Sequence, residues 1–259
     1  MYIKLDYEKY KDYVSIEKRY DYDCEYIITK IKKNISKNDK IIPRIRLTNK
    51  NGNNKSLYNF MNDDEILFGI NAGIFNTSTG EAECLLISNN KIYKDQYETY
   101  IHNDKKDGGE KRNELYILGI SKEGNLKIYN PSITGEEIIK DGCMDAVMGF
   151  VPLTLDFKQI DLDNLCSYIS MDKHPRQIIG QLENDDYIIM TVLKPGMTLK
   201  ETRKILKTLN VRDAYNLDGG SSTQSIYHHQ SLIPFYREKT GRHIPSVITF
   251  EVITGDLII

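Results

Sequence analysis

Three stretches of the chain share one pattern, in which two short apolar runs flank a few turn-forming residues. They are ECLLISNNKIYK (83–94), ELYILGISKEGNLKIYN (114–130) and RQIIGQLENDDYIIMTVL (176–193). Asn, Asp and Gly tolerate the backbone conformations that tight hairpin turns require. Each stretch is therefore predicted to be a β-hairpin, and the sheet built from them should be largely antiparallel.

A single helix is clearly marked after the third hairpin. Thr198 and Glu201 have the spacing of a capping box, and apolar residues then recur at helical spacing up to Leu209. Asn210 is a suitable stop. An apolar strand, 214–217, follows directly. We therefore predict an α+β fold with a mixed, largely antiparallel sheet and a few packed helices, in which a catalytic domain (46–259) follows an N-terminal extension (1–45).

Composition excludes several classes of protein. The chain has 259 residues and a net charge of −2, and its Lys and Arg residues are interspersed with acids, which argues against a nucleic-acid partner. No apolar run is long enough to span a membrane. The first residues lack the apolar core of a signal peptide, so we expect a cytoplasmic protein, a processed one, or one delivered by a phage particle or by lysis. The four scattered Cys residues are expected to be buried free thiols.

The segment NLDGGSST (216–223) places a carboxylate, two glycines and three hydroxyls directly after that buried strand. Asp-Gly-Gly is also ordinary turn chemistry. However, two glycines let a backbone approach a ligand closely, and Ser221, Ser222 and Thr223 supply more donors than one turn uses. Asp218 and Asn216 should face the same side of the strand, since side chains alternate along it.

In this context the sequence resembles the phosphodiester glycosidase family. NLDGGSST follows a helix that opens with GMTLKE (196–201) and precedes GRHIPSVITFEV (241–252). GINAGIFN (69–76), GFVPLTLDFK (149–158) and PRQIIGQLENDDYIIMTV (175–192) resemble further elements in the family's order. The resemblance covers roughly residues 65–253. It departs at Ser221, where the family often has a third glycine, which concerns the width of the pocket.

The resemblance implies hydrolysis of the bond between a sugar and phosphate in a sugar-1-phosphodiester. Arg176 and Arg242 match family positions, and arginine pairs bidentately with phosphoryl oxygens. Asp218 is expected to be the acting carboxylate, with Glu81 as a candidate partner, because most glycosidases use two carboxylates. The predicted catalytic residues are thus Asp218, Arg176 and Arg242. The predicted substrate-binding residues are Asn71, Gly73, Asn216, Gly219, Gly220, Ser221, Ser222, Thr223 and His243.

No motif indicates a catalytic metal, a nucleotide or a dinucleotide cofactor, although loop carboxylates leave room for a structural Ca²⁺. The expected partner is a sugar-phosphodiester or a phosphate-containing glycopolymer, and no oligomeric state is specified. Two alternatives remain. One is a non-catalytic binder of phosphate-containing polysaccharide, for example on a phage particle. The other is a serine hydrolase, since 219–223 nearly makes a Gly-x-Ser-x-Gly elbow. The charged segment 102–114 is expected to be a surface loop or a rim of the cleft.

Overall fold

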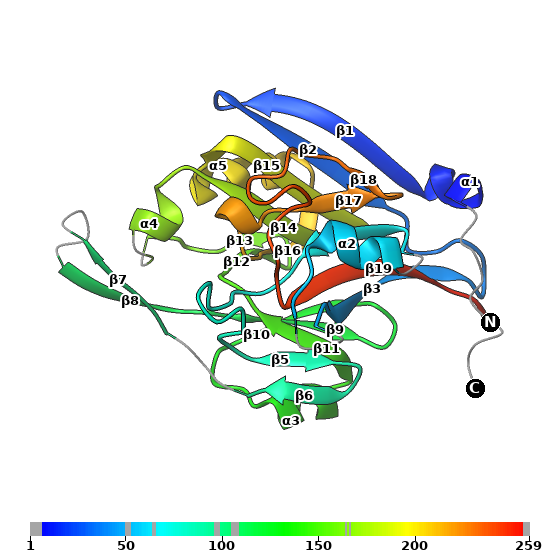
Figure 1. The fold of residues 1–259 in the computed structure, drawn as a ribbon, viewed down its shortest axis with the longest axis horizontal. Coiled ribbons are helices and arrows are strands. Elements are labelled where there is room, and N and C mark those ends of the chain that lie inside the picture. Colours follow the sequence, from blue (N-terminus) through cyan, green and yellow to red (C-terminus); the bar gives the residue numbers. More distant parts are fainter. Residues whose placement is uncertain are drawn as a thin grey trace.

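The computed structural model describes residues 7–49, 53–63, 66–95, 99–104, 109–163, 165 and 167–255. Its largest sheet has the strand order β1-β2-β15-β14-β16-β12-β13 (Figure 1). The strands are β1 (Val14–Asp21), β2 (Cys24–Ile31), β12 (Pro152–Leu155), β13 (Lys158–Gln159), β14 (His174–Leu182), β15 (Tyr187–Met197) and β16 (Val211–Asn216). All of these strands pair antiparallel with their neighbours.

Two five-stranded sheets lie beside this one, with the orders β10-β9-β11-β5-β6 and β18-β17-β4-β19-β3. The first contains β5 (Leu86–Ser88), β6 (Lys91–Lys94), β9 (Ile117–Ser121), β10 (Leu126–Tyr129) and β11 (Cys143–Met148). The second contains β3 (Lys40–Leu47), β4 (Phe68–Asn71), β17 (Ser225–Tyr227), β18 (Gln230–Ser231) and β19 (Ser246–Ile253). The predicted, largely antiparallel α+β fold is confirmed.

The three predicted hairpins are all present, as β5–β6, β9–β10 and β14–β15. Asn89 and Asn90 occupy the turn of the first with φ of 51° and 61°, and Gly124 and Asp185 adopt positive φ in the other two. Segment 102–114 was expected to be a loop. Instead β7 (Thr99–Asp104) pairs with β8 (Gly109–Glu114), and this hairpin projects from the side of the molecule that carries α4 (Figure 1).

The helices are short. They are α1 (Tyr7–Tyr10), α2 (Leu57–Asp63), α3 (Gly135–Lys140), α4 (Ser167–Ser170) and α5 (Leu199–Thr208), with 3-10 turns η1 (Lys11–Tyr13) and η3 (Gly220–Ser222). The capping box at the start of α5 is confirmed, because Thr198 accepts from the backbone of Glu201 and the Glu201 side chain accepts from that of Thr198. Asn210, with φ of 51°, ends the turn that follows. None of the described helices is long and apolar enough to cross a membrane.

The central strands of the large sheet are buried on both faces. On β15, Ile189 packs into the core shared with the two smaller sheets, whereas its neighbour Ile188 packs into a second core against α5. On β14, Ile179 and Ile178 divide in the same way. Side chains alternate along a strand, so a strand covered on both faces needs a continuous apolar run. This explains why β15 has the nearly continuous apolar sequence IIMTV rather than a strict alternation of apolar and polar residues.

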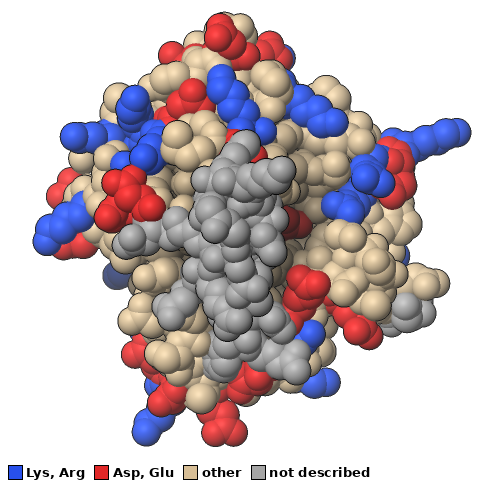
Figure 2. Space-filling view, turned by 90° about the vertical axis from the view of Figure 1, so that its left-hand side faces the viewer, with Lys and Arg blue, Asp and Glu red and all other residues tan. Residues whose placement is uncertain are grey.

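Most of the segment expected to be an N-terminal extension is part of these sheets. β2 pairs with β15, and β3 pairs with β19 over the full length of both strands. The expected boundary between residues 45 and 46 falls inside β3. Of the four cysteines, Cys24, Cys84 and Cys143 are buried free thiols, and Cys166 lies outside the described residues. On the face drawn in Figure 2, basic and acidic side chains are interspersed over the described surface.

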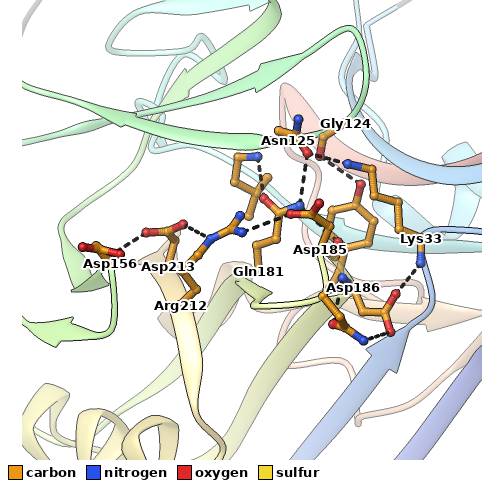
Figure 3. Close-up of polar contacts among 12 residues, drawn as sticks. Lys33, Gly124, Asn125, Asp156, Gln181, Asp185, Asp186, Arg212 and Asp213 are labelled. Carbon is orange, nitrogen blue, oxygen red and sulfur yellow. Dashed lines mark hydrogen bonds and ion pairs between the residues drawn. The ribbon is translucent and has the colours of Figure 1, made fainter.

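A polar network ties the hairpin tips to the start of β16 (Figure 3). Buried Lys33 donates through Nζ to Asn125, whose Oδ1 also lies 3.4 Å from Nε2 of Gln181. Arg212 donates to Asp185 at 3.0 Å and to Asp213 at 2.9 Å. Burial lowers the pKa of Lys33, because it removes the charged amine from water, and the charge of Asp185 acts against this shift. The network fixes one end of β16, and the opposite end carries the segment NLDGGSST.

Candidate active site

A pocket of about 470 Å³ lies where the first residues of β14, the end of β16, the segment after β4 and helix α4 meet. Its polar lining consists of Thr77, Glu83, Arg176, Asn216, Asp218, Ser221, Ser222 and Arg242, and its aromatic lining of Phe75, Phe150, Tyr168 and His174. Gly219 and Gly220 complete the floor. Eight of the twelve residues predicted for the site therefore meet in one pocket. Many of them come from segments far apart in the sequence.

Three hydrogen bonds hold Asp218 in place, two with backbone groups and one from the side chain of Asn71. Its N–H donates to the carbonyl of Ala72 at 3.1 Å, its carbonyl accepts from Nδ2 of Asn71 at 2.7 Å, and its Oδ1 accepts from the N–H of Gly219 at 2.9 Å. A Cβ at Gly219 would lie 2.6 Å from the carbonyl oxygen of Pro175, so only glycine allows this approach to β14. Gly220 turns the chain with φ of +57°. The two glycines are thus needed for the geometry of the carboxylate.

Burial raises the pKa of Asp218 to about 6, and the charge of Glu83 acts in the same direction. Hydrogen bonds from Ser222 and from the Gly219 backbone oppose the shift, as does the positive charge of Arg242. A carboxyl group with a pKa near neutrality can exist in both protonation states under working conditions. Among the described residues, this is the perturbed carboxyl group that lines a pocket.

Arg176 is buried, with 5% of its surface exposed, and no carboxylate lies within ion-pair distance of it among the described residues. Nε donates to the carbonyl of Met197 at 3.1 Å, and Nη2 donates to those of Ile169 and Asp172, both at 2.9 Å. Nη1 makes no hydrogen bond within the described part of the chain. Burial lowers the pKa of Arg176 to about 10, which still leaves a cation at neutral pH. The site therefore holds a buried cation bonded to neutral carbonyls, on which the charge of Asp172 acts from beyond ion-pair distance, and such a cation in a pocket wall suits an anionic ligand.

Arg242 provides a second cation in the pocket lining. Its Nη1 donates to Oγ of Ser222 at 3.3 Å, and its guanidinium lies 5.3 Å from the centre of the Phe75 ring. Ser222, in turn, donates to Asp218. Arg242 therefore connects to the carboxylate through one hydroxyl, while the rest of its guanidinium faces the pocket.

Asn216 contributes a buried acceptor that lacks a partner. Its Nδ2 donates to the carbonyl of Leu217 at 3.0 Å, but Oδ1 has no hydrogen-bond partner within the described residues. An unpaired buried carbonyl oxygen costs free energy, and such groups are found where a ligand donor completes them. Asn216 and Asp218 both line the pocket, as strand alternation predicted.

Four residues predicted to bind substrate lie outside the pocket lining. Asn71 is buried behind Asp218, and its Oδ1 accepts from the N–H of Gln224 at 3.0 Å. Gly73 packs against β11, where a Cβ would meet Val147. Thr223 is buried, and His243 is exposed. Asn71 and Gly73 thus shape the site from outside, because one fixes a backbone and the other permits close packing.

The second carboxylate of the pocket is Glu83, and the candidate Glu81 is an exposed loop acid, which was the favoured interpretation of its position in the sequence. Glu81 is exposed, and its backbone carbonyl accepts from Asn76 at 2.9 Å at the base of a turn. Glu83 lines the pocket two residues later, where the chain passes Ile74. Alternation in an extended segment sends Glu81 and Glu83 in similar directions, so the sequence alone offered no basis for choosing between them.

His174 and Tyr168 are pocket residues that the sequence did not single out. Their rings lie 4.8 Å apart, and Nε2 of His174 is buried without a partner among the described residues. Burial and the charge of Arg176 lower the pKa of His174, which keeps the ring neutral at neutral pH. Within the described ranges, no group of three or more His, Cys, Asp or Glu side chains is arranged to hold a metal ion.

Comparison with known families gives one match, a family described as phosphodiester glycosidase, over residues 64–251. This range contains every residue of the pocket lining. Comparison with curated protein sequences gives no significant match.

Solved structures share the fold. The catalytic domain of zebrafish N-acetylglucosamine-1-phosphodiester alpha-N-acetylglucosaminidase, auto-inhibited by its pro-peptide, is 18% identical with a TM-score of 0.63, over 92% of this chain and 82% of that one. A hypothetical protein from Synechocystis is 14% identical with a TM-score of 0.64, over 93% and 62%. A putative exported protein from Burkholderia pseudomallei K96243 is 9% identical with a TM-score of 0.57, over 88% and 74%. At these identities the similarity establishes a common fold.

Proposed function

The chain belongs to the phosphodiester glycosidase family, and on that premise we propose that it hydrolyses the bond between an anomeric carbon and phosphate in a sugar-1-phosphodiester. One pocket is lined both by Arg176, a buried cation without a carboxylate partner, and by Asp218, whose pKa is raised to about 6. This observation carries the proposal. The first suits a phosphodiester anion and the second suits an anomeric centre.

The phosphate would lie between Arg176 and Arg242. The Nη1 group of Arg176 makes no hydrogen bond with the described residues, and Arg242 is held by its hydrogen bond to Ser222. When the glycosidic bond breaks, the diester monoanion becomes a phosphomonoester with a second negative charge. Two fixed guanidinium groups stabilise that growing charge most when the bond is nearly broken, and this lowers the barrier.

Asp218 would face the anomeric carbon. Water supplies the oxygen that becomes the sugar's anomeric hydroxyl, the C1–O bond breaks, and the phosphomonoester leaves with the original bridging oxygen. As the bond breaks, positive charge develops at C1, and the ionised carboxylate of Asp218 stabilises it. Phosphate is a good leaving group, so the reaction asks little of a general acid. Glu83 is the second carboxylate of the pocket and would act on the attacking water.

The sugar would be held by groups that lie beside this carboxylate. The unpaired Oδ1 of Asn216 can accept from a sugar hydroxyl, and Ser221 is at the pocket surface with its hydroxyl available to the ring. The zebrafish enzyme acts on an N-acetylglucosamine phosphodiester. We extend that to this chain as the first sugar to test.

The proposal is tested with a panel of UDP-sugars and simple sugar-1-phosphodiesters, following free sugar and phosphomonoester for the wild type and Asp218→Asn. Release by the wild type that is lost in the variant supports the assignment. A protein that binds a phosphate-containing polymer but releases no sugar from any panel member would instead be a non-catalytic binder. Inactivation by a serine-directed fluorophosphonate would point to the serine hydrolase alternative.

A further inference from the structure

Exposed aromatic and thioether side chains gather beside the pocket. Among the described residues, four of the seven large hydrophobic side chains that are exposed are Tyr20, Tyr22, Tyr168 and Met171, with 66%, 38%, 39% and 52% of their surface accessible. The turn between β1 and β2, helix α4 and helix α5 lie on the same side of the molecule (Figure 1). Exposed rings in such number on one side of a small protein call for a ligand or a partner.

The segments that carry these side chains adjoin one another and define a path that starts at the pocket. Tyr168 lines the active-site pocket, and its ring lies 4.8 Å from that of His174 at an angle of 56°. Met171 follows at the end of α4, and Lys173 then donates through Nζ to the carbonyl of Tyr22 at 3.0 Å. This hydrogen bond joins the turn between β1 and β2 to Lys173, the residue that precedes His174.

At the far end of the path lies a second hollow, of about 450 Å³, between the β1–β2 hairpin and α5. Tyr20, Tyr22 and Tyr26 line it together with Arg19 and Lys204. Tyr26 donates to Asp21 at 2.6 Å, and Arg19 donates to Glu17 at 2.7 Å, so both are held in place. Lys204 is exposed and makes no ion pair within the described part of the chain. The hollow thus offers flat rings and a cation at the surface.

The turn between β1 and β2 presents one of these rings to solvent. Tyr22 and Asp23 have φ of 53° and 59°, the conformation of a two-residue turn that favours Asn and Gly. The turns at Asp156–Phe157 and His228–His229 have the same conformation, so this backbone is a recurring feature of the chain. The turn at Tyr22 differs from them in lying beside α5 and a hollow that Tyr22 lines.

We propose that this path, Tyr168–Met171–Tyr22–Tyr20, binds the chain of a phosphate-containing glycan that extends out of the active-site pocket. The inference rests on the proposed function and adds to it that the substrate is a polymer rather than a single sugar unit. Sugar rings stack on exposed aromatic faces. A phosphate between the sugars would meet Lys204, in a hollow whose lining also includes Asp21. Lys173 is held between the carbonyl of Tyr22 and the carboxylate of Glu201, 3.8 Å away, and serves to fix the path. The pocket takes the unit that is cleaved, and the hollow by α5 takes units several repeats away.

The test compares N-acetylglucosamine 1-phosphate oligomers of one linkage and of about eight repeats as substrates. The variant combines Tyr20→Thr, which suits a strand, with Tyr22→Asn, which suits the left-handed turn, so that the rings are lost without strain. Tyr93→Thr is the matched control, since Tyr93 is an exposed tyrosine on β6, outside the path. Circular dichroism and thermal unfolding confirm that all three proteins fold.

We expect the KM of the wild type to be about 10-fold lower for the long oligomer than for the short one, a ratio equivalent to about 1.4 kcal/mol. The double variant should lose this difference and keep wild-type kinetics on the short oligomer, and the Tyr93 control should behave as wild type. Equal KM values for both lengths in the wild type, or an unchanged length effect in the double variant, would overturn the path.

A wild type that cleaves neither oligomer would exclude N-acetylglucosamine as the sugar, and one that also cleaves no other sugar-1-phosphodiester of the panel would refute the proposed function, in both cases without deciding on the path. In that case, binding of the long oligomer is measured by calorimetry with the same proteins. Weaker binding in the double variant alone supports the path, and equal binding in all proteins overturns it.

Discussion

Asn71 and Asp218 are 147 residues apart in sequence, yet Nδ2 of Asn71 donates to the main-chain carbonyl of Asp218 at 2.7 Å. The other end of the same amide accepts from the backbone of Gln224 at 3.0 Å. Asn71 therefore bridges the two ends of the turn that carries the carboxylate and the hydroxyl residues. It lies behind the pocket and acts as a positioning residue.

Asn71→Ala should lower both activity and stability. The substitution leaves a buried carbonyl and a buried N–H without partners, which costs about 1–3 kcal/mol of unfolding free energy. We expect kcat to fall at least tenfold with a smaller change in KM, and the acid limb of the pH profile to move. Gln181→Ala is the control, because Gln181 is also a buried amide bonded to backbone, in the network of Figure 3. It should lose stability but keep the pH profile.

The pH dependence of kcat/KM reports on Asp218. If the ionised carboxylate acts, the rate should rise with pH to a midpoint near the pKa of about 6 and then level off. Ser222→Ala removes a hydrogen bond that lowers this pKa, so its midpoint should lie at higher pH. A profile that instead falls above pH 6 would assign the active form to the protonated acid.

The raised pKa of Asp218 also predicts an effect on the free energy of unfolding. Burial makes the charged form of Asp218 unfavourable in the folded protein, which lowers the free energy of unfolding when the group is ionised. The loss of stability is absent below pH 4, near the pKa of about 4 in the unfolded chain, and complete above the pKa of about 6 in the folded protein. Asp218→Asn should therefore be more stable than wild type at pH 8, by about 1–3 kcal/mol, and the difference should shrink toward pH 4. Urea unfolding at several pH values measures it. A difference that is constant with pH would contradict the assigned shift.

Glu83→Gln should reduce kcat, whereas Glu81→Gln should not. Only Glu83 lines the pocket, and its charge raises the pKa of Asp218. Neutralising it should therefore also move the midpoint of the acid limb to lower pH. Glu81 is an exposed acid two residues away, which makes it a close control. Equal effects of the two substitutions would remove Glu83 from the mechanism.

Arg242→Gln should weaken phosphate binding without unfolding the protein. Arg242 is partly exposed, whereas Arg176 supports three buried carbonyls, and its loss would destabilise the fold as well. We expect kcat/KM to fall about 10- to 100-fold, as for the loss of one charge-assisted contact of about 1.5–3 kcal/mol. Protection against thermal unfolding by a phosphomonoester should decrease in parallel.

Features that depend on local residue chemistry could be predicted from the sequence. Neighbouring residues alone predict the turn at Asn89–Asn90, the capping box at Thr198 and the strand that ends at Asn216. The same holds for the carboxylate after that strand, because its environment of glycines and hydroxyls is contiguous.

Features that depend on tertiary contacts could not be predicted from the sequence. Whether Asn71 faces the substrate or the backbone is decided by Asp218 and Gln224, which lie about 150 residues away. His174 was not singled out in the sequence, because only the packing of α4 brings Tyr168 to within 4.8 Å of its ring. Similarly, β2 gains its place in the large sheet from its pairing with β15.

The central claim is that the chain breaks the bond between carbon and oxygen at the anomeric centre. Hydrolysis of a sugar-1-phosphodiester in water enriched in ¹⁸O tests it most directly, with mass spectrometry of the released phosphomonoester, whose oxygens do not exchange with water. We expect a phosphomonoester without ¹⁸O, because the water oxygen enters the sugar. One ¹⁸O atom in the phosphomonoester would show attack at phosphorus and contradict a glycosidase mechanism.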